Sequence, residues 1–166
     1  MKIFITCVAS LSLFLGFIFM DAPKLKRSDL QLLTGAQWTG TLTYLDYSTN
    51  KKVSIASKLL VTQSNAGKFA WVFDYQYPDE PKANGTKEVI LSPDGTTISG
   101  EKVVERTKVD GSPLRITTEK TGSENDKQAL FRFTYLISAK SFSIKKEVRY
   151  EGTTDFIERN QYSWTR

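Results

Sequence analysis

The sequence has no histidine and a single cysteine, Cys7, among its 166 residues. The chain therefore lacks the usual side chains for acid–base catalysis near neutral pH, for zinc binding and for a disulfide framework. The rest of the composition, 40% hydrophobic and 25% charged residues, is that of one ordinary globular domain. This composition excludes a collagen, a coiled coil and an intrinsically disordered chain.

The chain also lacks a concentrated region of positive charge. Its formal net charge is +5, but lysines and arginines are spread among aspartates and glutamates along the whole length, and no basic run exceeds three residues. Nucleic-acid binding domains usually carry a clustered basic patch. We therefore expect no nucleic-acid partner.

Residues 1–22 resemble a secretory leader. Lys2 is followed by an almost unbroken apolar stretch from Ile3 to Met20, and Asp21-Ala22 ends it. The apolar stretch has about 18 residues, which is also close to the lower limit for a membrane-spanning helix. Two interpretations stay open. In the first, the leader is cleaved and the protein is periplasmic, part of the cell envelope or secreted. In the second, residues 3–20 remain as an inner-membrane anchor, which is the only membrane contact that we expect.

A short N-terminal linker at 23–36 precedes a region, 37–166, that follows one pattern to its end. Segments of about eight to eleven residues alternate apolar and polar side chains, and Gly, Asp, Asn, Ser or Pro follow each segment. This pattern is typical of β-strands and turns. One helical turn is expected within 28–34. Strands are expected near 37–47, 52–63, 67–77, 86–92, 96–109 (kinked at Gly100), 113–121, 127–137, 141–150 and 155–165.

The last three expected strands have a register that two loops define independently. A four-residue loop at 138–141 and a second loop at 151–155 place nearly all the apolar side chains on one face. The other face aligns Glu147 with Arg132 and Arg159, as on a solvated surface. The predicted inner pairs are Ile137–Phe142, Tyr135–Ile144, Phe133–Lys146, Phe131–Val148, Ala129–Tyr150, Val148–Glu158, Lys146–Asn160, Ile144–Tyr162 and Phe142–Trp164.

The third expected strand carries five aromatic side chains on one face. These residues are Phe69, Trp71, Phe73, Tyr75 and Tyr77. A face of this size left in water would forfeit about 25 cal/mol for each Å² that burial removes from solvent. Since no helices are available to cover it, the sheet is expected to close on itself. We predict an all-β fold, a monomeric antiparallel up-and-down β-barrel of about eight to ten strands.

The sequence from about residue 30 to the end resembles the calycin superfamily, which contains the lipocalins and small bacterial lipocalin-like proteins. The similarity lies in Leu33-Thr34-Gly35-Ala36-Gln37-Trp38-Thr39-Gly40 at the first strand and in the terminal strand from Glu158 to Arg166. The resemblance implies that Trp38 forms the barrel floor and that Arg166 or Arg159 covers it by a cation–π contact. The family's usual Gly-x-Trp spacing differs here, since two residues separate Gly35 from Trp38. The resemblance also implies binding of small apolar molecules.

Polar residues on the expected inner face mark a candidate binding site, because a buried charge needs a partner or a ligand. Lys146 is expected to face Asn160 and to lie diagonal to Glu158, and Glu105 joins them in one of two registers. The cluster either satisfies itself as an internal ion pair or anchors a ligand carboxylate or hydroxyl. The apolar wall either lines a cavity or fills the barrel completely. Its expected residues are Tyr44, Trp71, Phe73, Phe131, Phe133 and Tyr162.

The sequence predicts a binding protein and not an enzyme. It contains no nucleophile-elbow pattern and no phosphate-binding glycine loop, and we expect neither a cofactor nor a metal. The ligand would be a small hydrophobic or amphipathic molecule inside the barrel. The alternative is a filled barrel of the cell envelope that contacts a partner through its outer loops and holds no internal ligand.

Overall fold

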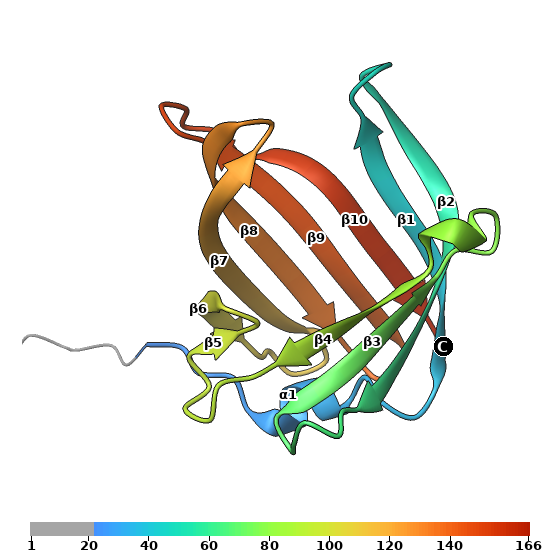
Figure 1. Cartoon of the computed structure of the whole chain (residues 1–166). Coiled ribbons are helices and arrows are strands. Elements are labelled where there is room, and N and C mark those ends of the chain that lie inside the picture. Colours follow the sequence, from blue (N-terminus) through green and yellow to red (C-terminus); the bar gives the residue numbers. More distant parts are fainter. Residues whose placement is uncertain (1–21) are drawn as a thin grey trace, which may run out of the picture.

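The structure is a computed structural model that describes residues 22–166. All but the last residue of the predicted leader lie outside the described residues. Ten strands form a single antiparallel sheet in the order β4-β3-β2-β1-β10-β9-β8-β7-β6-β5, which curls into a nearly closed barrel (Figure 1). The predicted all-β barrel is therefore confirmed. Within residues 22–166, no helix is long and apolar enough to cross a membrane.

The strand boundaries agree with the predicted ranges to within a few residues. The elements are α1 (Arg27–Gln31), β1 (Gln37–Asp46), β2 (Lys51–Gln63), β3 (Ala70–Gln76), η1 (Pro81–Ala83), β4 (Gly85–Ile90), β5 (Thr97–Ile98), β6 (Glu101–Thr107), β7 (Leu114–Glu124), β8 (Lys127–Ile137), β9 (Ser141–Tyr150) and β10 (Ile157–Thr165). The strand expected at 96–109 is two strands, not one kinked strand. Ser99 and Gly100 both have positive φ, 49° and 79°, so the chain reverses there in a tight hairpin turn.

The register of β8 against β9 is the predicted one, from Ile137–Phe142 to Ala129–Tyr150. The register of β9 against β10 agrees from Phe142–Trp164 to Lys146–Asn160, and a β-bulge at Arg159 then shifts it by one residue. Beyond the bulge, Val148 pairs with Ile157 instead of Glu158. A bulge adds one residue to one strand and so exchanges its two faces.

The two ends of the sheet meet at only one point. Leu91, just after β4, forms a single antiparallel bridge with Ile98 of β5. From Gly85 to Val89, β4 has a strand partner on one side only, which is β3. β4 therefore crosses the open side of the barrel in front of β7–β10 (Figure 1).

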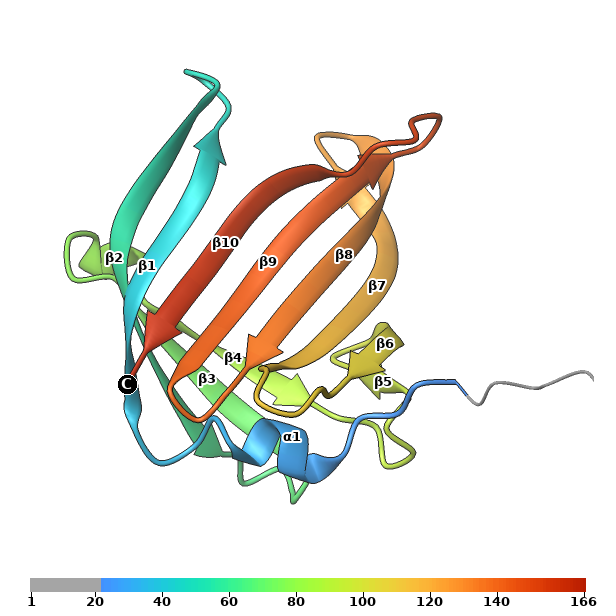
Figure 2. The same cartoon turned by 180° about the vertical axis from the view of Figure 1, so that it is seen from behind.

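The lower end of the barrel is closed by α1 and the segment after it (Figure 2). Leu30 and Leu33 are buried there against the inner face, and the indole nitrogen of Trp38 donates to the Leu33 carbonyl at 2.9 Å. The guanidinium carbon of Arg166 lies 4.2 Å from the centre of the Trp38 ring. Trp38 and Arg166 thus form the floor that the resemblance implies.

Arg159 does not cover Trp38. Its side chain is near the opposite, upper end of the barrel, where its guanidinium carbon lies 3.5 Å from the centre of the Tyr47 ring. The floor is formed by the end of β10, and Arg159 is near the beginning of that strand. Arg166 is therefore the arginine that fits the expected role.

Candidate functional site

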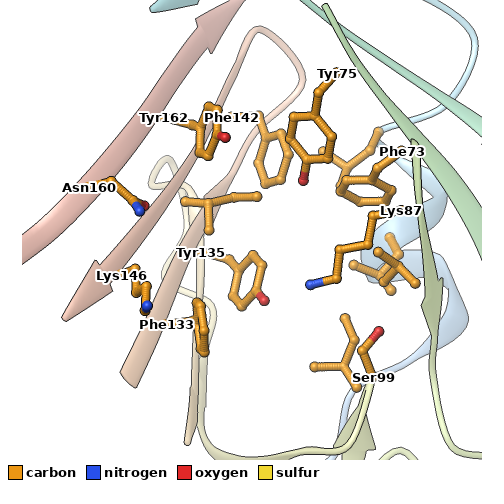
Figure 3. Close-up of a pocket in the computed structure, with 15 residues that line it drawn as sticks. Phe73, Tyr75, Lys87, Ser99, Phe133, Tyr135, Phe142, Lys146, Asn160 and Tyr162 are labelled. Carbon is orange, nitrogen blue, oxygen red and sulfur yellow. The ribbon is translucent and has the colours of Figure 1, made fainter. Parts of the chain in front are cut away.

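The barrel encloses a cavity of about 260 Å³ that extends from α1 at the floor to the level of Lys146 and Asn160. Figure 3 shows side chains from β3, β4, β8, β9 and β10 surrounding this space. Its volume equals the liquid volume of about nine water molecules. The barrel therefore is not completely filled by its own side chains, and the space is large enough for a small organic molecule.

The wall of the cavity on the β1–β3 and β9–β10 side consists of aromatic rings that pack on one another. Tyr162 stacks on Trp164 with 4.8 Å between ring centres, and Phe142 stacks on the same indole at 5.3 Å. Phe73 meets Phe142 edge to face at 6.3 Å. Stacked and edge-to-face contacts fix ring orientation, so the rings of this wall hold one another in place.

Three tyrosines, Tyr75, Tyr135 and Tyr162, line the cavity. The hydroxyls of Tyr162 and Tyr77 share a hydrogen bond of 2.7 Å, and that of Tyr135 donates to Glu101 at 3.1 Å. The Tyr75 hydroxyl makes no hydrogen bond to any described residue and points into the cavity (Figure 3). Burial is the main cause that raises the pKa of Tyr75, Tyr135 and Tyr162. All three therefore stay neutral near physiological pH, and the unpartnered hydroxyl of Tyr75 can donate a hydrogen bond to a ligand.

Glu101 on β6 is a buried carboxylate next to Tyr135, with a relative exposure of 1%. It accepts hydrogen bonds from Thr118 at 2.7 Å and from Tyr135, and the Lys120 ammonium lies 3.5 Å away. A buried carboxylate is stable only when such partners satisfy it. Glu101 fixes the Tyr135 hydroxyl and leaves its oxygen free to accept a hydrogen bond from the cavity side.

Lys87 lies on β4 opposite Phe73. Its ammonium points into the same space as the hydroxyls of Tyr75 and Tyr135 (Figure 3). Among residues 22–166, no carboxylate lies within ion-pair distance of Lys87, and its ammonium makes no hydrogen bond to a side chain or carbonyl. Sequence reasoning missed both Lys87 and Glu101. The available signal was alternation, because they lie two residues before the inner-face residues Val89 and Val103.

Lys146 points inward, as predicted, and lies opposite Asn160 at the upper end of the cavity. Its ammonium donates to Glu124 at 2.8 Å, and Arg159 donates to the same carboxylate at 2.7 Å. The Tyr47 hydroxyl, at the tip of the β1–β2 hairpin, also donates to Glu124, at 2.6 Å. We call these residues, Tyr47, Glu124, Lys146 and Arg159, the Glu124 cluster. It joins β7, β9, β10 and the β1–β2 hairpin above the cavity.

Two carboxylates expected inside lie on the outer face. Glu158 is moved outward by the bulge at Arg159 and pairs with Lys52 at 2.6 Å. Glu105 follows a second bulge, between Val103 and Glu105, and accepts from Thr117 on the outer face at 2.8 Å. The expected positions were wrong because each bulge exchanges the two faces of its strand. The carboxylate that Lys146 binds is Glu124.

The structure thus brings five of the predicted binding residues to the cavity: Phe73, Phe133, Lys146, Asn160 and Tyr162. Trp71 is fully buried in the core beside it, and Phe131 lies beneath the Lys146 ammonium, 4.6 Å from ring centre to nitrogen. Tyr44 borders a shallower depression above the cavity, which shares Lys146 and Asn160 with it. The predicted apolar wall therefore divides into cavity lining and supporting core.

Within residues 22–166, no group of three or more carboxylate, cysteine or histidine side chains is placed to hold a metal ion. A scan against protein-family models finds none that matches the chain, and a search of curated proteins finds no matching sequence.

Proposed function

We propose that this barrel is a binding protein that holds one small amphipathic molecule in its interior. The observation that carries the proposal is the cavity of about 260 Å³, which is enclosed by aromatic rings and reached by several polar groups. Small-molecule sites are typically concave and mostly apolar, with a few polar groups that fix orientation. The volume is near the lower end of the roughly 300–1,000 Å³ usual for such sites, so the ligand is small.

The rigidity of the wall supports the same proposal. The rings of Phe142, Tyr162 and Trp164 stack on one another, so they have little conformational freedom to lose when a ligand binds. An apolar body would displace water from this wall. The free hydroxyl of Tyr75 and the amide of Asn160 would fix its polar end.

We further propose that the barrel is of the calycin type and acts outside the cytoplasm. The sequential order of its strands and the packing of Arg166 on Trp38 support the family assignment. The export assignment rests on the leader-like sequence of residues 1–22 alone. Neither assignment is needed for the binding experiment.

The test is a fluorescence titration of the full chain with N-phenylnaphthylamine, a neutral aromatic amine that brightens in apolar surroundings. The proposal predicts saturable binding of one probe per chain. The variant Ile144→Trp adds bulk to the cavity wall and should abolish binding.

The matched control is Ser143→Trp, which adds the same indole one residue earlier, outside the cavity lining. This variant should bind the probe as the unmodified chain does. Equal loss in both variants, or no saturable binding in the unmodified chain, would contradict the proposal.

A further inference from the structure

The charges that border the cavity are unbalanced. Some of the cations are neutralised, since Lys120 lies beside Glu101, and Lys146 and Arg159 share Glu124. Lys87 has no such partner within the described residues. Of these groups, Lys87 and Lys146 line the cavity, and Lys87 is also exposed to solvent.

Lys87 also has a hydrogen-bonding companion on the neighbouring strand. In the β3–β4 pairing, Lys87 lies opposite Phe73 and Tyr75 lies opposite Gly85, so Lys87 and Tyr75 are diagonal neighbours on the inner face. Burial raises the pKa of Tyr75, which keeps its hydroxyl protonated and able to donate. An ammonium and a hydroxyl that converge on one point form a site for an anionic oxygen.

The apolar groups next to this pair define the rest of the ligand. Phe73 and Phe133 line the cavity on opposite sides (Figure 3). A molecule whose acidic group meets Lys87 and Tyr75 would place its body between these rings. The site lies beside the edge of β4 that has no strand partner, and Lys87 itself is exposed to solvent.

From these observations we propose that the ligand is a small organic acid, held by its anionic group at Lys87 and Tyr75 and by its apolar body between the aromatic rings. This inference rests on the proposed function and adds the chemical class of the ligand. It moves the polar anchor from Lys146, whose charge Glu124 neutralises, to Lys87 on the opposite wall.

The test compares two probes that differ by one anionic group. N-phenylnaphthylamine is neutral, and anilinonaphthalene sulfonate is the same ring system with a sulfonate. The full chain should bind the sulfonate about tenfold more tightly, which corresponds to about 1.4 kcal/mol. Lys87→Gln should lower the affinity for the sulfonate about tenfold, and Tyr75→Phe about threefold. Lys87→Gln should bind the neutral probe within about twofold of the unmodified chain, which also shows that this variant folds.

The control for general charge attraction is Lys102→Gln, which removes an exposed lysine from the outer face of β6. It should change the affinity for neither probe by more than about twofold. If it weakens sulfonate binding as much as Lys87→Gln does, the site at Lys87 is refuted.

The inference and the proposed function fail in different ways. Saturable binding of the neutral probe with no preference for the sulfonate, or a sulfonate affinity that Lys87→Gln leaves unchanged, refutes the acid site and leaves the binding cavity intact. If the unmodified chain binds neither the neutral probe nor the sulfonate, the proposed function is refuted, and the acid site is refuted with it.

Discussion

The Glu124 cluster allows the stability of the upper end of the barrel to be tested by one isosteric change, Glu124→Gln. The carboxylate accepts from Lys146, Arg159 and Tyr47 at 2.8, 2.7 and 2.6 Å. The amide has no charge and offers only one accepting oxygen. The variant would therefore leave Arg159, whose side chain is only 7% exposed, without its counter-charge.

The size of the effect follows from the exposure of the partners. Removing one member of a fully buried ion pair costs about 3–5 kcal/mol. Here the Lys146 side chain is 26% exposed and can turn toward water, so its share of the loss is reduced. We expect the free energy of unfolding to fall by about 2–3 kcal/mol, which lowers the melting temperature by about 5–10 °C for a chain of this size.

The assay is urea unfolding followed by tryptophan fluorescence, because Trp38, Trp71 and Trp164 are all buried and report on the core. The matched control is Glu105→Gln on the outer face, whose pair with Arg115 is 40–50% exposed. This control should change stability by less than about 0.5 kcal/mol. If the two variants have equal stability, the cluster contributes no more than a surface ion pair and the reasoning is wrong.

Three further predictions concern the floor, a strand contact and the tyrosines. Arg166→Gln removes the stacking on Trp38 and the hydrogen bonds to the Ala139, Thr34 and Leu32 carbonyls. Urea unfolding should show that the free energy of unfolding falls by about 1–2 kcal/mol, and an unchanged urea midpoint would refute a structural role for this arginine. Gly40→Ala should destabilise the protein by about 3 kcal/mol or more, because the new Cβ overlaps the Ser163 carbonyl. The control Gly85→Ala places its Cβ where no atom lies within 4 Å and should leave stability nearly unchanged. Similar melting temperatures for the two variants would count against the β1–β10 packing. Because Tyr75, Tyr135 and Tyr162 have raised pKa values, the stability they contribute is complete below about pH 10 and is lost as the pH rises through their folded-state pKa values. An ultraviolet titration should show these three of the seven tyrosines still protonated at about pH 11 in the folded protein, and full ionisation there without unfolding would contradict their burial.

The strands were predictable because the signal for them is local. Alternation of apolar and polar side chains gives both the extent of a strand and its inner face. For β8 and β9, this was enough to obtain the pairing from Ile137–Phe142 to Ala129–Tyr150. The floor was also predictable, because Trp38 and Arg166 are both part of the resemblance.

The candidate site was only partly predictable because two bulges exchange the faces of their strands. The alternation on each side of Arg159 is intact, so nothing in the local sequence shows that Glu158 turns outward. For Glu105, the adjacent apolar residues Val103 and Val104 left two registers open, and the bulge between Val103 and Glu105 turns its side chain outward. Lys87 was missed because its neighbours Gly85, Thr86 and Glu88 are polar or small, so the alternation that leads from Val89 back to Lys87 is weak.

The central claim is that the interior of the barrel holds a small molecule. The measurement that tests it most directly is native mass spectrometry of the protein purified gently from its own host, before and after incubation with N-phenylnaphthylamine. We expect a mass excess that disappears on denaturation, or, where the natural ligand has been lost, an added mass of one probe per chain that Ile144→Trp prevents. If only the mass of the chain without ligand is found, both before and after incubation with the probe, the claim of an internal binding site is contradicted.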